Sequence, residues 1–215
     1  MDWNVMVQYL PQYEKAAWLT LRLGVAGIFW AILVGLVCAV LQYEKVPVLR
    51  RIVGAYIQLG RNTPLLVQLF VIFYGLPRLG VTLDAFPSAI IVFSINTGAY
   101  AAETMRAAIL SVPKGQMEAG YCAGMTYPRI MTRIILPQAA RTAFPPLSNS
   151  LIGLLKDTSL ASNITIMEMF MSAQRIAART YDSFALYCEV ALIYLLFCTF
   201  LTKVQRICEK KLELN

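Results

Sequence analysis

Long apolar stretches set the strongest limit on how this chain can fold. Five of them, over residues 19–41, 52–76, 86–109, 144–171 and 184–204, are long enough to cross the roughly 30 Å hydrocarbon core of a bilayer. In the whole chain 58% of residues are hydrophobic and 14% are charged, whereas soluble domains contain about 45–50% apolar and about 25% charged residues. The N-terminal residues lack a basic segment and a small-residue cleavage site, so no removable signal peptide is expected. The pattern predicts an all-α integral membrane protein with five transmembrane helices, in which residues 1–215 form one domain.

The basic residues between and after these stretches indicate the orientation of the chain. Twelve Lys and Arg residues fall on one predicted side of the membrane and four on the other. Because the side richer in Lys and Arg is usually cytoplasmic, we expect the N-terminus outside and the C-terminus in the cytoplasm. The twelve are Lys45, Arg50, Arg51, Arg106, Lys114, Arg129, Arg133, Arg141, Lys203, Arg206, Lys210 and Lys211, and the four are Lys15, Arg78, Arg175 and Arg179. The net charge of +7 is thereby explained by loops near membrane lipid, and no nucleic-acid partner is expected.

Residue types that support catalysis or cofactor binding are scarce. The chain has no His, and none of its five Cys residues forms a CxxC pair, so a zinc or haem site is not expected and the cysteines are interpreted as packing residues. A GxxxxGK[ST] phosphate loop is also missing, so the chain cannot power a reaction with ATP by itself. We therefore expect a non-catalytic subunit. A membrane-bound redox or cysteine enzyme is the alternative that these observations disfavour.

A polar, basic segment, residues 113–140, separates the third and fourth apolar stretches. Ser111 could cap a helix that begins near the following proline, since proline fits the first helical turn. Gly124 could end this helix in a left-handed turn, and Thr126 could cap a second short helix that Pro137 limits. The segment is thus predicted to be two short helices bent at Gly124. It could lie on anionic lipid as an amphipathic loop, or it could dock another protein.

Four charged residues fall inside the predicted spans: Arg61, Glu103, Lys156 and Asp157. A charge near the bilayer centre costs at least about 2.5–3.5 kcal/mol on insertion scales, so such residues usually face a partner or a water-filled cavity. Neighbours on a helix point about 100° apart, so Lys156 and Asp157 need not pair with each other. One could bind a substrate carboxylate and the other its ammonium group, or the pair could hold two spans or two subunits together.

Pro64 interrupts the second stretch and cannot donate a hydrogen bond to the carbonyl of Gly60. We expect a kink at this point, after which the freed carbonyl needs another partner. Arg61 lies just before the kink. It either stabilises the kink by pairing with a carboxylate or contacts the ligand directly.

On the third stretch, Asn96, Tyr100 and Glu103 share one helical face, at positions i, i+4 and i+7. This face could line a translocation path. Glu103 lies close to the predicted cytoplasmic end, so a structural salt bridge with Arg106 or Arg141 is an equal alternative for that residue.

Four segments, in the same order along the chain, resemble segments of the polar amino acid uptake permeases of ABC importers. They are RNTPLLVQLF from residue 61, INTGAYAAETMRAAI from residue 95, EAGYCAGMTYPRIMTRIILP from residue 118 and KDTSLAS from residue 156. The third resembles the EAA loop, the cytoplasmic element that fits into a cleft of the ATPase subunit in this family. Gly120 replaces the usual second alanine of that loop, and Asn62 replaces the usual glycine of the first segment. The resemblance covers nearly the whole chain.

The resemblance implies a type I ABC importer permease fold in the bacterial cytoplasmic membrane. It also implies partners: two ABC ATPase subunits, a second permease chain that is identical or paralogous, an extracellular substrate-binding protein and an amino acid substrate. ATP and Mg would be bound by the partner ATPase, and no cofactor by this chain. The residues implied for ATPase coupling are Glu118, Ala119, Gly120, Gly124, Arg129, Ile134, Leu136 and Pro137. The residues predicted for the substrate pathway are Arg61, Asn62, Thr63, Asn96, Tyr100, Glu103, Lys156, Asp157, Thr158 and Ser159.

The implied mechanism is alternating access driven by ATP binding in the partner. Cystine or a related compound is the favoured substrate, while basic amino acids, glutamine and glutamate stay open. The alternative is an ion-coupled secondary amino acid transporter, which the broken second stretch and the buried charges would fit. The short chain, the lack of an obvious internal inverted repeat and the otherwise unexplained segment 113–140 speak against this alternative.

Overall fold

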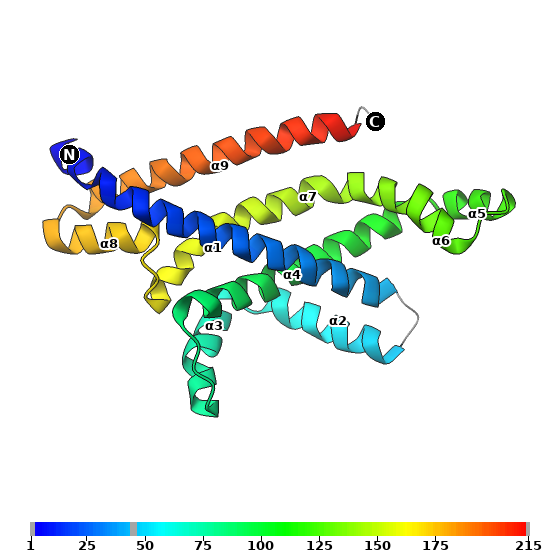
Figure 1. Ribbon diagram of the computed structural model, residues 1–215, viewed down its shortest axis with the longest axis horizontal. Helices are drawn as coiled ribbons and strands as arrows, with labels where there is room; N and C mark the ends of the chain where they lie inside the picture. Colours follow the sequence, from blue (N-terminus) through cyan, green and yellow to red (C-terminus); the bar gives the residue numbers. More distant parts are fainter. Residues whose placement is uncertain (1–2, 44–46, 214–215) are drawn as a thin grey trace.

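The computed structural model describes residues 3–43 and 47–213, with side chains described for residues 9–42 and 47–212. All regular elements in these ranges are helical, which confirms the predicted all-α fold. Figure 1 shows long helices that follow the long axis of the molecule, with shorter ones around them. The long helices are α1 (Trp3–Tyr43), α4 (Ala85–Ser111), α7 (Leu136–Asp157) and α9 (Ser183–Glu213). The shorter helices are α2 (Pro47–Asn62), α3 (Leu65–Phe70), α5 (Lys114–Cys122), α6 (Tyr127–Ile130) and α8 (Met169–Thr180).

Small residues allow α1 and α4 to pack closely along their length. A Cβ atom on Gly35 of α1 would lie 2.7 Å from the Cβ atom of Ala101 and 3.2 Å from the backbone nitrogen of Ala102. On α4, a Cβ atom on Gly98 would lie 2.9 Å from a methyl carbon of Val34. In a membrane, lipid chains are as apolar as a neighbouring helix, so close backbone approach through small residues is a main source of helix association. The α1–α4 pair forms the support on which α2 and α7 pack.

The predicted kink of the second stretch is confirmed and is large. α2 ends at Asn62, and the segment Leu65–Leu79, which begins with α3 after Pro64, runs at 108° to it. The chain continues from α3 through a π-helical turn, η1 (Val71–Gly75), and a 3-10 helix, η2 (Leu76–Leu79). These elements project from the bundle as an arm (Figure 1).

The fourth predicted span, residues 144–171, is not one helix, so its predicted bounds are wrong. α7 ends at Asp157, and a 3-10 helix, η4 (Thr158–Ile164), follows it. Thr165 then turns the chain with a φ of 68°, and Glu168 begins α8 by accepting hydrogen bonds of 2.7 and 2.9 Å from two N–H groups of its first turn. An apolar run does not reveal where a left-handed residue and a capping carboxylate redirect the backbone.

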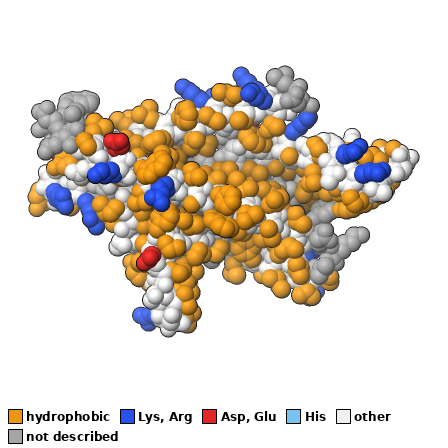
Figure 2. All heavy atoms as spheres, in the orientation of Figure 1, with side chains coloured by type: hydrophobic (Ala, Val, Ile, Leu, Met, Phe, Trp, Pro, Cys, Tyr) orange, Lys and Arg blue, Asp and Glu red, His pale blue; other side chains and the backbone are white. Residues whose placement is uncertain are grey.

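Within the described ranges, three helical segments are long and apolar enough to cross a membrane: Tyr9–Gln42, Ala85–Ser111 and Ser183–Leu212. The bent pair, Pro47–Asn62 with Leu65–Leu79, would make a fourth. Figure 2 shows hydrophobic side chains over the middle of the visible face, while Lys and Arg side chains lie along its upper edge and toward the two ends. This distribution is that of a chain embedded in a bilayer, while the number of five spans stays a prediction.

The segments that were predicted to be cytoplasmic lie at one end of the molecule. The C-terminal end of α1, the start of α2, the α5–α6 segment and the C-terminal end of α9 share this end, whereas the N-terminal end of α1 and the α8–α9 connection lie at the other (Figure 1). Their placement fits the predicted orientation, which stays a prediction. Lys45 lies outside the described residues.

Candidate functional site

The predicted bend within residues 113–140 centres on Gly124. This glycine adopts a φ of 72°, in the left-handed region that glycine enters without strain. The N–H of Met125 donates to the carbonyl of Gly120 at 3.0 Å and so closes the end of α5. α6 begins directly after Thr126. The predicted helix–Gly–helix element is therefore confirmed.

The predicted side-chain caps of this segment are wrong. Ser111 belongs to the last turn of α4, where its hydroxyl donates to the carbonyl of Ala108 at 2.8 Å, and Pro113 stands at the N-cap of α5. Thr126 occupies the N-cap of α6, but its hydroxyl makes no capping bond there. The Ser111 hydroxyl is taken up by its own helix, because serine readily bonds to a carbonyl three or four residues back.

Pro137 does not end the second helix, contrary to the prediction. α6 continues through a wide π-helical turn, η3 (Met131–Ile135), into α7, and Pro137 lies in the first turn of α7. The N–H of Leu136 bonds to the carbonyl of Met131, five residues back. The wider turn therefore lies directly before the first turn of α7, in which Pro137 has no N–H to donate. As a result, helix runs without a break from Tyr127 to Asp157.

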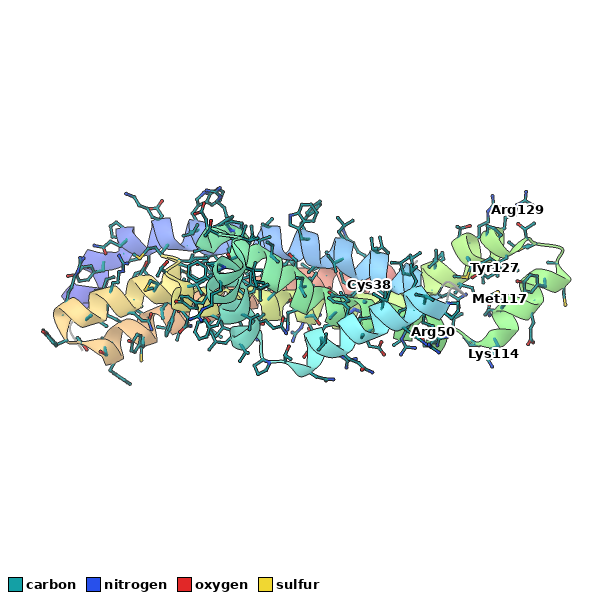
Figure 3. All side chains as sticks on the ribbon, turned by 90° about the horizontal axis from the view of Figure 1, so that it is seen from below. Cys38, Arg50, Lys114, Met117, Tyr127 and Arg129 are labelled. Carbon is teal, nitrogen blue, oxygen red and sulfur yellow. The ribbon has the colours of Figure 1, made fainter. Side chains whose placement is uncertain are left out.

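α5 and α6 pack against each other through Gly120 and Ile130. The Ile130 side chain is fully buried, and a Cβ atom on Gly120 would lie only 2.7 Å from its Cγ1. Figure 3 shows Met117 and Tyr127 on the facing sides of the two helices, with Arg129 on an outer side. The turn is therefore a packed unit that presents its basic groups outward.

Most of the residues predicted for ATPase coupling lie on the surface. Glu118, Ala119, Gly124, Arg129, Leu136 and Pro137 are exposed, Ile134 is half-buried and Gly120 is buried. Glu118 also lines, with Lys114 and Met117, a groove of about 290 Å³ at the base of α5. These positions leave the segment available to a protein partner, and the coupling role of the residues stays a prediction.

The kink at Pro64 builds the second part of the site. The freed carbonyl of Gly60 accepts two hydrogen bonds, from Asn96 Nδ2 at 2.8 Å and from Gln68 Nε2 at 3.0 Å. Gln68 also donates to the Thr63 hydroxyl at 2.6 Å. The expectation that the freed carbonyl needs another partner is confirmed. One donor comes from the next turn of the same arm and the other from α4.

Beside the kink lies a cleft of about 500 Å³ between α2, α4 and α7. The Arg61 guanidinium lies 5.5 Å from the ring centroid of Tyr100, within the range of a cation–π interaction. The Tyr100 hydroxyl donates to the carbonyl of Arg61 at 3.2 Å. Asp157, at the end of α7, lines the same cleft. The cleft therefore has one cation and one carboxylate in its wall.

Six of the predicted pathway residues line this cleft: Arg61, Asn62, Thr63, Asn96, Tyr100 and Asp157. Glu103, Lys156, Thr158 and Ser159 are not among its lining residues. Glu103 forms the predicted salt bridge with Arg106, whose Nε lies 2.9 Å from its carboxylate. The hydroxyl groups of Thr158 and Ser159 bond to carbonyls of the preceding helical turn, and Lys156 is exposed.

Sequence reasoning missed several residues of the site. Gln68 is part of the RNTPLLVQLF segment, and its position one turn after Pro64 was the available signal. Thr97, Ser150 and Gly153 also line the cleft without any signal in the sequence. Among the described residues, no group of three or more His, Cys, Asp or Glu side chains could hold a metal ion, and the five cysteines are free.

Comparison with known proteins gives the relationship of the whole chain. Residues 31–214 match the family model of the binding-protein-dependent transport system inner membrane component. The chain is 47% identical over 215 residues to the L-cystine transport system permease protein TcyB of Bacillus subtilis (strain 168), covering 99% of this chain and 92% of that protein. It is 39% identical over 215 residues to the probable amino-acid ABC transporter permease protein PatM of Vibrio harveyi, covering 99% and 96%.

Solved structures share the fold. A crystal structure of an amino acid ABC transporter with histidines is 33% identical and superposes with a TM-score of 0.94, covering 98% of this chain and 99% of that chain. An inward-facing structure of the MetNI methionine ABC transporter is 18% identical, with a TM-score of 0.80 and coverage of 99% of each chain. The second likeness is one of fold alone.

These relationships settle the class of the protein. The predicted type I ABC importer permease fold is confirmed, and the ion-coupled secondary transporter is not supported. The chain is a non-catalytic, multi-pass inner-membrane subunit that works with an ATPase and a substrate-binding protein. It belongs to the family of binding-protein-dependent transport system inner membrane components, the permease subunits of ABC importers.

Proposed function

We propose that this chain forms the membrane pathway for an amino acid and binds it in the cleft beside the kink. The observation that carries the proposal is that Arg61 and Asp157, from distant parts of the sequence, line one cleft of about 500 Å³. An amino acid is a zwitterion, so its carboxylate and ammonium groups need a cation and a carboxylate close together. Arginine suits the first task because its planar guanidinium can bind a carboxylate through two parallel hydrogen bonds. The cleft volume falls within the range of about 300–1,000 Å³ that is usual for small-molecule sites.

The favoured substrate is cystine or a related compound. The support is the 47% identity to a permease named for L-cystine transport. Cystine carries a zwitterionic group at each end, so one end could bind between Arg61 and Asp157 while the other extends toward the polar side chains of Asn62 and Thr63. Basic amino acids, glutamine and glutamate are the competitors that an uptake assay must compare.

Residues 113–140 are proposed to dock into the ATPase. The packed turn around Gly124 exposes Glu118, Arg129 and Leu136 to a partner, and it continues into the α6–η3–α7 helix. At about 1.5 Å per residue, the 31 residues from Tyr127 to Asp157 span roughly 45 Å. One continuous helix thereby joins the docking turn to the carboxylate of the cleft. A displacement of the turn by the ATPase could be transmitted to Asp157 through this helix.

In the complete importer, we propose two permease chains, identical or paralogous, and two ATPase chains that bind ATP and Mg. The substrate-binding protein would load the permease at the end that carries the N-terminus, which lies outside. Five spans, including α7, would cross the membrane. ATP and the loaded binding protein would shift the chain between inward and outward states through their different contacts with each state.

The test is uptake of labelled cystine into proteoliposomes that contain the permease, its ATPase and its binding protein. Arg61→Gln and Asp157→Asn should each lower uptake about tenfold, which corresponds to the loss of one charge-assisted contact. Lys156→Gln and Arg78→Gln, outside the cleft, should leave uptake near that of the wild type. Normal uptake by the Asp157 variant, or equal losses in all four variants, would remove the cleft as the substrate site. Competition by glutamine, arginine or glutamate would identify another substrate.

A further inference from the structure

A second cavity, of about 510 Å³, lies along α2, next to the C-terminal ends of α1 and α4. Its charged lining residues are Arg50 and Arg61 of α2 and Glu103 and Arg106 of α4, and Gln42 of α1 also contributes. Arg50 is labelled near the start of α2 in Figure 3. Arg61 also lines the substrate cleft, whereas the other residues named here belong neither to that cleft nor to the docking turn.

The cavity has an excess of positive charge. Three arginines against one glutamate leave a net charge of two positive charges in its wall. The glutamate is already occupied, because both of its oxygens bond to Arg106. Arg50 forms no ion pair with any residue that the structure describes. Arg106 is thus paired, and Arg50 and Arg61 are the arginines of the cavity without an acidic partner among the described residues. Basic pockets between membrane helices are typical binding sites for anionic headgroups.

The cavity also has free space and a free acceptor. A Cβ atom on Gly54, which lines the cavity, would meet no atom within 4 Å. The glycine therefore leaves open volume on the face of α2 between Arg50 and Arg61. Gln42 carries a buried amide oxygen with no hydrogen-bond partner in the described part of the chain. A headgroup with hydroxyl groups could donate to this oxygen while its phosphate contacts the arginines.

The Arg50 end of the cavity lies where lipid headgroups are expected. The candidate spanning helices Tyr9–Gln42 and Ala85–Ser111 both have their C-terminal ends beside the cavity, and Arg106 lies about one and a half turns before Ser111. Arg50 lies in the first turn of α2, which starts just after α1 ends. On the outer side of α2, Ile52 is 64% exposed and Leu59 is 66% exposed. Acyl chains could cover these side chains while the headgroup enters the cavity.

We propose that this cavity binds a phosphate group, carried by an anionic phospholipid of the leaflet at this end of the molecule. Arginine is suited to the task because its guanidinium binds phosphate oxygens through two parallel hydrogen bonds. The cavity shares Arg61 with the substrate cleft, so the phosphate contact is assigned to Arg50, which lines this cavity but not the cleft. The tests therefore change Arg50 and Gly54 and leave Arg61 in place.

The experiment measures lipid binding to the purified permease–ATPase complex, with phosphatidylglycerol as the probe and phosphatidylcholine as the neutral comparison. Bound lipid is counted by native mass spectrometry and titrated in nanodiscs of mixed composition. Arg50→Gln should weaken phosphatidylglycerol binding about tenfold, through the loss of one charge-assisted contact. Arg51→Gln is the matched control, because Arg51 is adjacent and exposed but does not line the cavity; it should leave binding unchanged.

Gly54→Leu tests the space without changing any charge, and it should abolish the preference for phosphatidylglycerol. Gly54→Ala leaves most of the volume and suits a helix interior better than glycine, so it should retain binding. If Gly54→Leu fails to fold, the comparison of Arg50→Gln with Arg51→Gln still decides.

A separate titration with inorganic phosphate distinguishes the sources of the phosphate. Phosphate binding with the same dependence on Arg50 and Gly54, and without a lipid preference, would support the phosphate site with a soluble ligand. Absence of both lipid preference and phosphate binding in the wild type would overturn the proposal. Equal losses in the Arg50 and Arg51 variants would also overturn it, since they would reveal a general charge effect.

Discussion

The two hydrogen bonds to the Gly60 carbonyl allow a quantitative test of how the kink is stabilised. Asn96→Ala removes the donor from α4, and Gln68→Ala removes the donor from the arm. After either single change the carbonyl keeps one partner. At about 1 kcal/mol for each hydrogen bond, Asn96→Ala should lower the free energy of unfolding by about 1 kcal/mol, and Gln68→Ala, which also loses the bond to Thr63, by about 2 kcal/mol. After both changes the carbonyl has no partner, and burial of such a group costs a further 1–3 kcal/mol, roughly. The double variant should therefore lose about 4–6 kcal/mol, more than the sum of the single losses.

The measurement is reversible unfolding of the purified protein in mixed detergent micelles, arranged as a double-mutant cycle. A matched cycle pairs Gln68→Ala with Thr202→Ala, whose hydroxyl bonds only within α9. That cycle should be additive within about 0.5 kcal/mol, as expected for distant sites. If the losses caused by Asn96→Ala and Gln68→Ala are equally additive, then water or a shifted backbone satisfies the Gly60 carbonyl in the double variant. The kink would then not depend on these two side chains.

Two further predictions concern glycines with different surroundings. Gly124→Asp, at a φ of 72°, should leave membrane insertion intact but abolish ATP-driven uptake, measured in proteoliposomes at matched protein amounts; normal uptake would contradict the docking role of the turn. Gly35→Val should separate α1 from α4, because the added Cβ would lie 2.7 Å from Ala101, and should cost about 1–3 kcal/mol or more. Its melting temperature in detergent should fall well below that of Gly54→Ala, where the added Cβ meets nothing within 4 Å; equal melting temperatures would refute the close-packing argument.

The features that sequence reasoning predicted correctly are those fixed by local backbone chemistry. Pro64 has no N–H in any environment, so a kink and a freed carbonyl follow from the sequence alone. Gly124 enters a left-handed turn at little cost, so a helix end could be expected there. The partners of the Gly60 carbonyl could not be foreseen in the same way. Asn96 is 36 residues away, and only the packing of α2 on α4 brings it within hydrogen-bond distance.

The charged pair of the cleft likewise depends on packing between distant parts of the sequence. Lys156 and Asp157 are neighbours, and their opposite charges suggested a zwitterion site. The end of α7 places Asp157 in the cleft wall and leaves Lys156 exposed. The cation in the cleft is Arg61, nearly a hundred residues earlier in the sequence. Adjacent residues on a helix point about 100° apart, so their side chains are not expected to line the same pocket unless the helix ends there.

Pro137 shows how a correct local rule can give a wrong prediction about structure. Proline removes one N–H donor and crowds the preceding turn, which in a regular α-helix breaks the bonding pattern. In this chain the bond pattern has already changed before the proline, because the N–H of Leu136 bonds five residues back, to Met131. The added width of that turn accommodates the ring, and the helix continues. The consequence reaches beyond local geometry. A break at Pro137 would leave the turn around Gly124 connected to the cleft by a flexible joint, whereas the continuous helix connects this turn directly to Asp157.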